Sequence, residues 1–229
     1  MPAAESPGDA PFTAVVVIGG GALSPRALDV LAAVDTQRRV IAADSGLDHA
    51  VAAGLRPDML VGDLDSISAS GRMWAYAHEL LIDEHPEAKD ETDTELALAA
   101  AAAMTDAQHL LLLGGIDLEG VDRLDHLLGT LLGLGHAALA HMRTITAVIG
   151  SSEVRVVHGG RSLDLRLDAG QVFSLLALHG PCSGVTLTGA QWPLDGASLA
   201  PTEARGVSNI SDGDTVVRVN QGVLTVVIP

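Results

Sequence analysis

The spacing of apolar residues changes near residue 142, and this change constrains the fold more than any other feature of the chain. Before that point, short runs made almost wholly of apolar residues alternate with segments of helical character. The apolar runs occupy residues 14–18, 40–43, 59–61, 80–82 and 110–113, and the helical segments occupy residues 25–34, 47–53, 92–104 and 123–139. Strands that are apolar on both sides belong to parallel sheets covered by helices on both faces. We therefore predict an α/β domain with a mostly parallel sheet over residues 13–142.

Beyond residue 142 the apolar runs are short and often alternate with polar residues, and Gly, Asp and Asn turns separate them. The runs occupy residues 144–149, 154–158, 163–167, 172–178, 185–187, 215–219 and 223–228. This pattern is typical of a small antiparallel sandwich or barrel, so we predict an antiparallel β-sandwich domain over residues 143–229. Residues 1–12 lack the basic start and apolar run of a signal peptide, and we expect a disordered tail there.

The chain is strongly acidic, with a formal net charge of −16. A negative field of that size argues against nucleic acid or an anionic membrane as the main partner. The longest apolar stretch, residues 127–142, is too short for a membrane span. Cys182 is the single cysteine, which excludes an internal disulfide and suits the cytoplasm, where we expect the protein to reside.

Two short acidic segments, residues 62–66 and 89–95, carry the clearest chemical signal. Clustered carboxylates repel one another unless a cation lies among them, and carboxylates with nearby hydroxyls suit Mg²⁺, which usually accompanies a phosphate substrate. Asp63 and Asp65 flank one residue, so in an extended loop both side chains project to one side and can reach one metal ion. The alternative is a simple turn that caps the next helix. Asp44 also follows a predicted strand, and ligands of such sheets bind beyond the carboxyl ends of the strands.

Several residues near these segments have two interpretations each. Thr92 has the spacing of a capping box, and Asp93 lies in the first turn of the same predicted helix, where the helix dipole stabilises an acid. Lys89 either offsets the repulsion among the surrounding carboxylates or contacts a phosphate oxygen. Arg123 opens the long predicted helix and either clamps a phosphate there or faces solvent. His126 is either a base or a structural hydrogen-bonding residue.

The second half offers two further candidates. Trp192 presents a flat indole face that suits a cationic heteroaromatic ring, or it fills a core or an interface. Ser208 and Asn209 either read the polar edge of a ring or form a turn. The glycines at 19–21 follow the first predicted strand, but they lack the ending of a phosphate-binding loop and are weak as a motif.

Taken together and in this order, these segments resemble the thiamine pyrophosphokinase (thiamine diphosphokinase) family. The resemblance extends from about residue 13 to residue 228. The matching stretches are residues 43–46, 57–66, 89–93, 123–126, 192–194 and 208–209. Ser45, Asp48, Asp122 and Thr130 depart from the residues that are usual in the family.

The resemblance implies an N-terminal domain that binds Mg-ATP, a C-terminal β-sandwich that binds thiamine, and a homodimer with active sites at the subunit interface. The metal ligands that it implies are Asp63, Asp65 and Asp93, which with Arg123 form the catalytic set. The other positions on the ATP side are Asp44, Lys89, Thr92, Asp125 and His126. The positions around thiamine are Trp192, Ser208 and Asn209.

We therefore expect an enzyme that transfers the diphosphoryl group of ATP to the hydroxyl of thiamine, giving thiamine diphosphate and AMP, with Mg²⁺ as cofactor. One alternative is a pyrophosphokinase for another alcohol, such as a hydroxymethylpterin, and the thiamine-side residues argue against it. The other is a non-catalytic nucleotide or thiamine sensor. The retained acidic cluster argues against a sensor, because a sensor has less need of a complete metal site.

Overall fold

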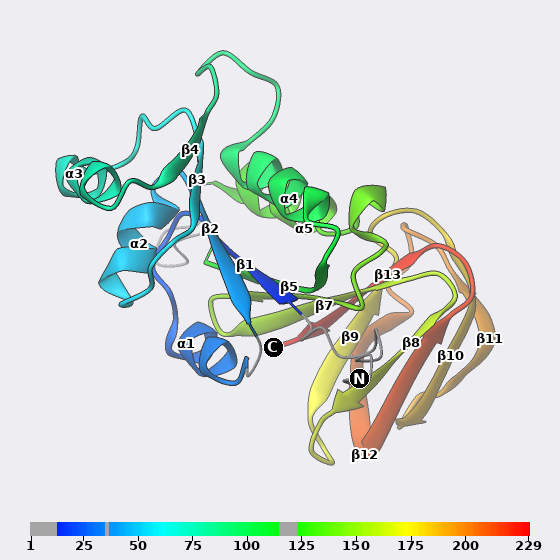
Figure 1. The fold of residues 1–229 in the computed structure, drawn as a ribbon. Coiled ribbons are helices and arrows are strands. Elements are labelled where there is room, and N and C mark those ends of the chain that lie inside the picture. The colour runs from blue at the N-terminus through cyan, green and yellow to red at the C-terminus, as the bar shows by residue number, and fades with distance from the viewer. Residues whose placement is uncertain (1–12, 35–36, 115–122) are drawn as a thin grey trace, which may run out of the picture.

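A computed structural model of the chain describes residues 13–34, 37–114 and 123–229 (Figure 1). The predicted tail, residues 1–12, and the departure at Asp122 lie outside these residues. The first half holds β1 (Thr13–Ile18), α1 (Pro25–Ala32), β2 (Arg38–Ala43), α2 (Gly46–Ala52), β3 (Met59–Gly62), α3 (Ala69–Ala77), β4 (Leu81–Glu84), α4 (Asp93–Ala103), β5 (Ala107–Leu113), α5 (Leu124–Gly133) and the 3-10 helix η1 (Ala137–Leu139). The second half holds β6 (Thr144–Ile149), β7 (Ser152–His158), β8 (Arg161–Arg166), β9 (Val172–Leu176), β10 (Cys182–Ala190), β11 (Leu194–Leu199), β12 (Gly206–Val219) and β13 (Val223–Ile228).

The parallel part of the sheet has the strand order β6-β5-β1-β2-β3-β4, which confirms the prediction for the first half. The central strand β1 is apolar from Ala14 onward, and its residues from Val15 to Ile18 are fully buried. β6 lies beyond residue 142, yet it pairs in parallel with β5 and antiparallel with β7. One continuous mixed sheet therefore joins the two halves, while their division into two domains at residue 142 stays a prediction.

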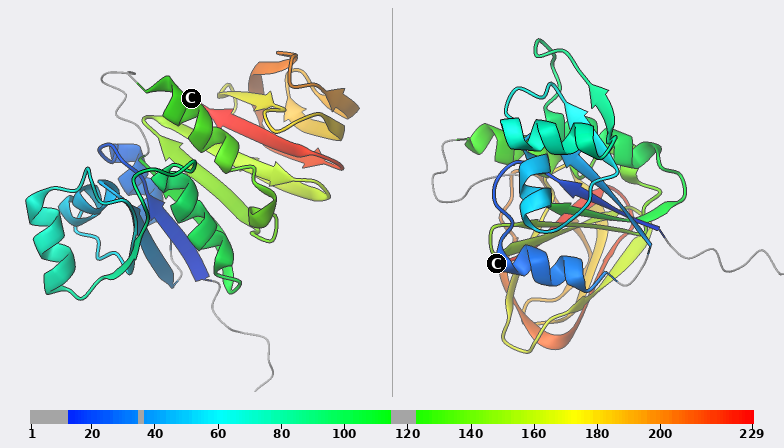
Figure 2. Two further views of the ribbon diagram at one scale, coloured as in Figure 1. Left: turned by 90° about the horizontal axis from the view of Figure 1, so that it is seen from above. Right: turned by 60° about the vertical axis from the view of Figure 1, so that its left-hand side comes forward.

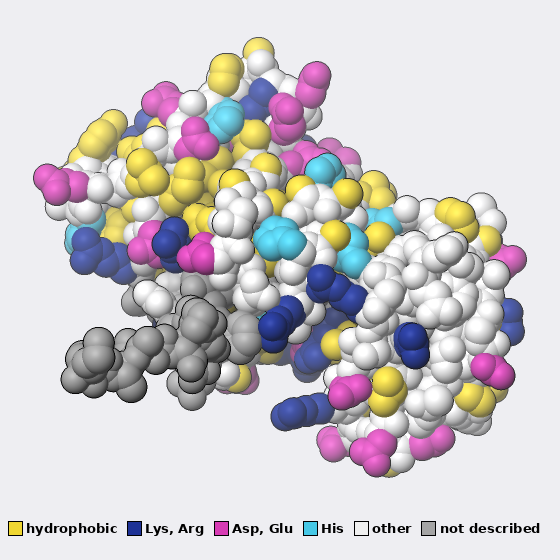
Figure 3. All heavy atoms as spheres, turned by 45° about the vertical axis from the view of Figure 1, so that its right-hand side comes forward, with side chains coloured by type: hydrophobic (Ala, Val, Ile, Leu, Met, Phe, Trp, Pro, Cys, Tyr) yellow, Lys and Arg dark blue, Asp and Glu magenta, His cyan; other side chains and the backbone are white. Residues whose placement is uncertain are grey.

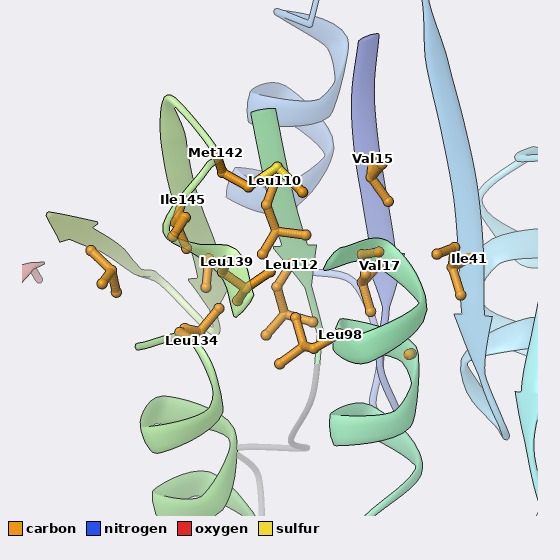
Figure 4. Close-up of a cluster of buried hydrophobic side chains, with 14 of the residues drawn as sticks. Val15, Val17, Ile41, Leu98, Leu110, Leu112, Leu134, Leu139, Met142 and Ile145 are labelled. Carbon is orange, nitrogen blue, oxygen red and sulfur yellow. The ribbon is translucent and has the colours of Figure 1, made fainter. Parts of the chain in front are cut away.

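Alternate residues of each strand point to opposite faces of the parallel sheet, so each face has its own apolar side chains. Helices cover both faces. Val15 and Val17 of β1 pack toward α4, where Leu98 meets them (Figure 4). Val16 and Ile18 pack on the other face in a core that includes α1. α4 begins with the predicted capping box, since the Thr92 hydroxyl accepts from the N–H of Glu95 at 3.2 Å while the Glu95 carboxylate accepts from the N–H of Thr92 at 2.9 Å.

The strands from β7 onward are antiparallel, as the alternating pattern predicted. The long strand β12 pairs with β8, β9 and β10, and these strands enclose a second core around the fully buried Phe173. The layering of this half as a β-sandwich stays a prediction. Within the described residues, no helix has both the length and the apolar character needed to cross a membrane.

The elements differ from the predicted ones in four places. Helix α3 and strand β11 were not predicted. Helix α5 ends at Gly133 instead of continuing to residue 139, and only the short helix η1 follows it. Strand β12 begins at Gly206, nine residues before the predicted run at 215–219.

Candidate metal and phosphate site

Three carboxylates meet at the carboxyl edge of the parallel sheet. Asp44 directly follows β2, Asp63 directly follows β3, and Asp93 is the first residue of α4. One carboxylate oxygen from each residue lies within 4.8 Å of the other two. The fold explains this convergence, because β2 and β3 are parallel neighbours whose ends lie side by side.

The backbone around these carboxylates adopts unusual conformations. Gly62 has a φ of 141°, and a Cβ there would lie only 2.9 Å from Asp93 Oδ1 and 3.2 Å from the Cβ of Asp44. Only glycine therefore lets the three carboxylates approach one another across this point. Asp44 and Leu64 also have positive φ values, 45° and 65°. Such strain in residues other than glycine concentrates at functional sites.

Lys89 lies between two of the three carboxylates. Its Nζ is 2.6 Å from Asp63 Oδ2 and 3.1 Å from Asp93 Oδ1, and its side chain is 10% exposed. The hydrogen bond from Lys89 lowers the pKa of Asp63, and the same bond raises the pKa of Lys89. One cation among three carboxylates leaves an excess of negative charge, so Lys89 offsets the repulsion only in part.

Asp44 is the carboxylate that Lys89 leaves uncompensated. The residue is 7% exposed, and its buried Oδ1 atom has no hydrogen-bond partner in the described part of the chain. Burial raises the pKa of Asp44, and hydrogen bonds from Ser66 and from the Ser45 backbone oppose the rise. A buried polar atom without a partner costs about 1–3 kcal/mol. Three carboxylates, one of them with an oxygen left unpaired, form a donor set that fits a hard divalent cation such as Mg²⁺.

Asp65 lies outside this group of three carboxylates. The positive φ of Leu64 bends the chain, so the residues from Asp63 to Asp65 do not have the expected extended geometry. Asp65 is exposed, its N–H donates to Asp63 Oδ1 at 3.2 Å, and its Oδ1 accepts from the Ser66 hydroxyl at 2.7 Å. A role for Asp65 as a metal ligand therefore stays a prediction.

Two residues that depart from the family pattern have local structural contacts. Asp48 accepts hydrogen bonds from the N–H and the hydroxyl of Ser68, at 2.8 and 2.6 Å, and Ser68 is the N-cap of α3. Asp48 thereby ties the start of α3 to α2. Thr130 is buried on α5.

Arg123, Asp125 and His126 form a cluster at the start of α5. The Arg123 guanidinium donates two hydrogen bonds of 3.2 Å to the two carboxylate oxygens of Asp125, and it also contacts the His126 ring. The hydrogen bonds from Arg123 lower the pKa of Asp125. The Arg123 side chain is 61% exposed at a helix N-terminus, a position that favours an anion.

At the other end of the sheet, Asn209 fixes the backbone of Trp192. Asn209 is 4% exposed, its Oδ1 accepts from the Trp192 N–H at 3.2 Å, and its Nδ2 donates to the Trp192 carbonyl at 2.8 Å. Trp192 is 53% exposed. Ser208 has a φ of 59°, and its N–H donates to the Ser174 hydroxyl at 3.0 Å. The sequence did not indicate that Asn209 positions Trp192, because the two residues are 17 positions apart.

Trp192 and the carboxylates lie far apart within one chain. Trp192 follows β10, which is eight positions from β2 in the strand order. At a strand spacing of about 4.8 Å, this separation is roughly 38 Å along the sheet. In the left view of Figure 2, the blue and cyan elements of the first half lie to the left and the orange strands of the second half lie at the right end.

Gly62 is the residue of the site that the sequence analysis missed. The signal was its place at the carboxyl end of a predicted strand, directly before an acid. Asp44 was assigned to the ATP side, but its oxygen belongs to the group that can hold a metal.

Two models of protein families match the chain. Residues 31–147 match the family model described as thiamin pyrophosphokinase, catalytic domain, and residues 162–224 match the model of its vitamin B1 binding domain. A search of curated proteins found no significant match.

Solved structures of similar proteins span almost the whole chain. A thiamine pyrophosphokinase from Bacillus subtilis is 23% identical with a TM-score of 0.77, and the match covers 94% of this chain and 98% of that one. A thiamin pyrophosphokinase from Geobacillus thermodenitrificans is 26% identical with a TM-score of 0.72, covering 95% and 97%. The yeast enzyme is 14% identical with a TM-score of 0.71, covering 97% and 88%.

The catalytic-domain match alone spans just over half of the 229 residues, and the carboxylates at the sheet edge lie inside it. The second match spans Trp192, which lies between β10 and β11, and Asn209 on β12. The chain belongs to the thiamin pyrophosphokinase family.

Proposed function

We propose that the protein is a thiamine diphosphokinase, which transfers the diphosphoryl group of ATP to the hydroxyl of thiamine. The observation that carries the proposal is the convergence of Asp44, Asp63 and Asp93 at the carboxyl edge of the sheet, inside the catalytic-domain match. The buried Oδ1 of Asp44 supports a metal role for this group, since it has no hydrogen-bond partner among the residues that the structure describes.

Asp44, Asp63 and Asp93 would hold Mg²⁺. When bound, this ion neutralises charge on the phosphate oxygens and makes phosphorus easier to attack. We also propose Asp65 as a ligand of this ion, and this assignment rests on the family resemblance alone.

The side chains of the protein supply alignment and charge. In the proposed reaction the thiamine hydroxyl oxygen forms a bond to the β-phosphorus of ATP, and the bond from that phosphorus to the α,β-bridging oxygen breaks. AMP leaves with the electron pair of that bond, and a carboxylate of the site accepts the hydroxyl proton. Arg123 and Lys89 stabilise the charge that develops on the bridging oxygen, while Thr92, Asp125 and His126 lie on the ATP side.

The proposal includes a homodimer in which each active site takes residues from both chains. Eight strand positions, or roughly 38 Å along the sheet, separate β10 beside Trp192 from β2 beside the carboxylates, which supports a site whose thiamine end comes from a second copy. Mixing two inactive variants tests this, with Asp63→Asn in one chain and Trp192→Ala in the other. If the sites are shared, hybrid dimers contain one intact site, and about a quarter of the wild-type activity returns. If each chain holds a whole site, mixing restores nothing.

The reaction itself is tested with purified protein, Mg-ATP and thiamine, by following AMP and thiamine diphosphate. Asp63→Asn should abolish turnover. Asp212→Asn serves as the matched control, because it makes the same change at an exposed position of β12. Release of ADP in place of AMP, or near-normal turnover of Asp63→Asn, would refute the proposal. Binding of thiamine without turnover would indicate a sensor instead.

A further inference from the structure

The segment that carries Asp63 connects β3 to α3. We name this segment, residues 63–68, the Asp63 loop. Its backbone turns at Leu64, whose φ of 65° lies in the left-handed region. A leucine persists in that region only where the surrounding structure holds it there. The contacts that hold Leu64 therefore decide where the preceding residue, Asp63, places its carboxylate.

Leu64 is held both through its side chain and through its carbonyl group. The side chain is buried in a small core that also includes Leu47 of α2 and Ala75 of α3. The carbonyl oxygen accepts a hydrogen bond from Nη2 of Arg72, a residue in the first turn of α3. Hydrogen bonds from a charged donor are roughly twice as strong as those between neutral groups. Arg72 thus stabilises the left-handed turn from outside the loop.

Packing alone gives α3 a weak hold on the rest of the molecule. Its buried residues are Gly71 and Ala75, which have little apolar surface to bury. Met73 and Tyr76 on its outer side are 72% and 73% exposed. In Figure 3 hydrophobic side chains are likewise exposed on the α/β half of the molecule. Polar contacts therefore contribute much of what fixes the position of α3.

Asp48 of α2 provides such a contact at the start of α3. Its two carboxylate oxygens accept from the N–H of Ser68 at 2.8 Å and from the Ser68 hydroxyl at 2.6 Å. Gly71 permits this approach, because a Cβ there would lie 2.4 Å from Asp48 Oδ1. The two helices accordingly lie side by side (Figure 1). Arg72 therefore reaches Leu64 from a helix that is itself anchored.

We propose that Arg72 is a positioning residue for the metal site: from α3 it holds Leu64 in the left-handed conformation and so keeps the carboxylate of Asp63 within the group of three. The inference rests on the proposed function, because the proposed Mg²⁺ is what this arrangement serves. Arg72 acts through the backbone, since its contact is the carbonyl that follows Asp63 in the chain.

The direction of the effect separates this role from a simple effect of charge. A positive charge near the carboxylates repels a divalent cation, so loss of Arg72 would strengthen Mg²⁺ binding if only its charge mattered. Loss of a positioning contact instead lets Leu64 leave the strained conformation and moves Asp63 away from the other carboxylates. The positioning role therefore predicts weaker Mg²⁺ binding, which is opposite in sign.

The test measures Mg²⁺ binding to the full-length protein by isothermal titration calorimetry, without ATP or thiamine. A second measurement, by NMR on the metal-free protein, follows exchange of the Asp65 N–H with water. This N–H donates to Asp63 Oδ1 at 3.2 Å, so its exchange reports whether the turn persists. Arg72→Ala should raise the dissociation constant for Mg²⁺ about tenfold and accelerate this exchange about tenfold, as expected for the loss of one charged hydrogen bond.

Three variants control for other causes. Arg72→Lys keeps a charged donor and should bind Mg²⁺ within about threefold of wild type. Arg166→Ala makes the same change as Arg72→Ala at an exposed position of β8 and should alter neither measurement. Ser68→Ala loosens the start of α3 without a change of charge and should weaken Mg²⁺ binding severalfold. Circular dichroism checks that each variant is folded.

Mg²⁺ binding by Arg72→Ala that is tighter than in wild type, or within twofold of it, would overturn the inference. So would unchanged exchange at Asp65, or an equal loss in Arg166→Ala. A wild type that binds no Mg²⁺ would overturn the inference together with the metal site. Neither measurement requires turnover, so the two proposals can fail separately. Weaker Mg²⁺ binding by Arg72→Ala, in a protein that makes no thiamine diphosphate, would remove the proposed function and leave the role of Arg72 standing.

Discussion

Replacing Asp44 with Asn should make the metal-free protein more stable while removing its metal-dependent activity. Within residues 13–34, 37–114 and 123–229 the buried Oδ1 of Asp44 has no hydrogen-bond partner, and the neighbouring carboxylates lie within 4.8 Å. Two unit charges 4.8 Å apart repel by about 3.5 kcal/mol at an effective dielectric constant near 20, before Lys89 and solvent are counted. Asn keeps the shape and removes the charge, and it also suits the φ of 45° at this position.

We expect a gain of about 1 kcal/mol in the free energy of unfolding, since the amide is itself left partly unpaired. For a domain of this size that gain raises Tm by about 2–4 °C. Asp63→Asn is the matched contrast, because it removes a charged hydrogen bond of 2.6 Å to Lys89 and should cost about 1–2 kcal/mol. Both variants should lose Mg²⁺-dependent turnover. The assay is thermal unfolding in EDTA and again in excess Mg²⁺.

The pH dependence of the difference between wild type and Asp44→Asn tests the cause. The pKa of Asp44 is raised by burial, so the charged form costs stability above that pKa. As the pH falls through the raised pKa, Asp44 becomes protonated and wild type recovers this cost. The Tm advantage of Asp44→Asn should therefore shrink between about pH 8 and about pH 4. An Asp44→Asn protein no more stable than wild type in EDTA at pH 8, or an advantage independent of pH, would refute the reasoning.

Three further predictions concern the surroundings of the two ends of the site. Lys89→Met should lower the free energy of unfolding by about 1–3 kcal/mol in EDTA and by less in excess Mg²⁺, and an equal loss in both conditions would contradict a charge-compensating role. Gly62→Ala should abolish the Mg²⁺-dependent rise in Tm, whereas Gly170→Ala, at a φ of 89° with open space around it, should keep that rise and so controls for backbone strain. Asn209→Ala should raise KM for thiamine about tenfold with KM for ATP unchanged, because it frees the backbone of Trp192, and equal changes in both constants would point to a general loss of folding.

The strands of the parallel sheet could be predicted because their apolar runs are buried on both faces. Helix α3 could not, since its buried positions are the small residues Gly71 and Ala75 while Met73 and Tyr76 are exposed. That arrangement reverses the usual apolar periodicity, which is the signal that sequence reasoning depends on. Strand β12 was predicted too short for a different reason. Its residues around Gly213 have the composition of a turn, and the pairing with β10 shifts register there, but the strand continues beyond this irregularity.

The members of the candidate site could be predicted more easily than their contacts. The position of Asp44 and Asp63 after parallel strands indicated convergence, and the structure brings these carboxylates together. The separate position of Asp65 depends on the left-handed conformation of Leu64, and no local pattern predicts that conformation for leucine. The contact of Asn209 with Trp192 depends on the tertiary pairing of distant segments.

Backbone strain is a signal for the site that is independent of the motifs. Among the described residues other than glycine, positive φ values occur at Asp44, Leu64, Glu79 and Ser208. Each costs of order 1–3 kcal/mol and persists only where the surrounding structure holds it in place. Three of the four lie in the acidic cluster or in the segment beside Trp192, the two regions that the family resemblance assigns to phosphate and thiamine. Strain that served only the packing of the core would have no reason to concentrate at these two distant ends of one sheet, so its distribution supports a function that needs both.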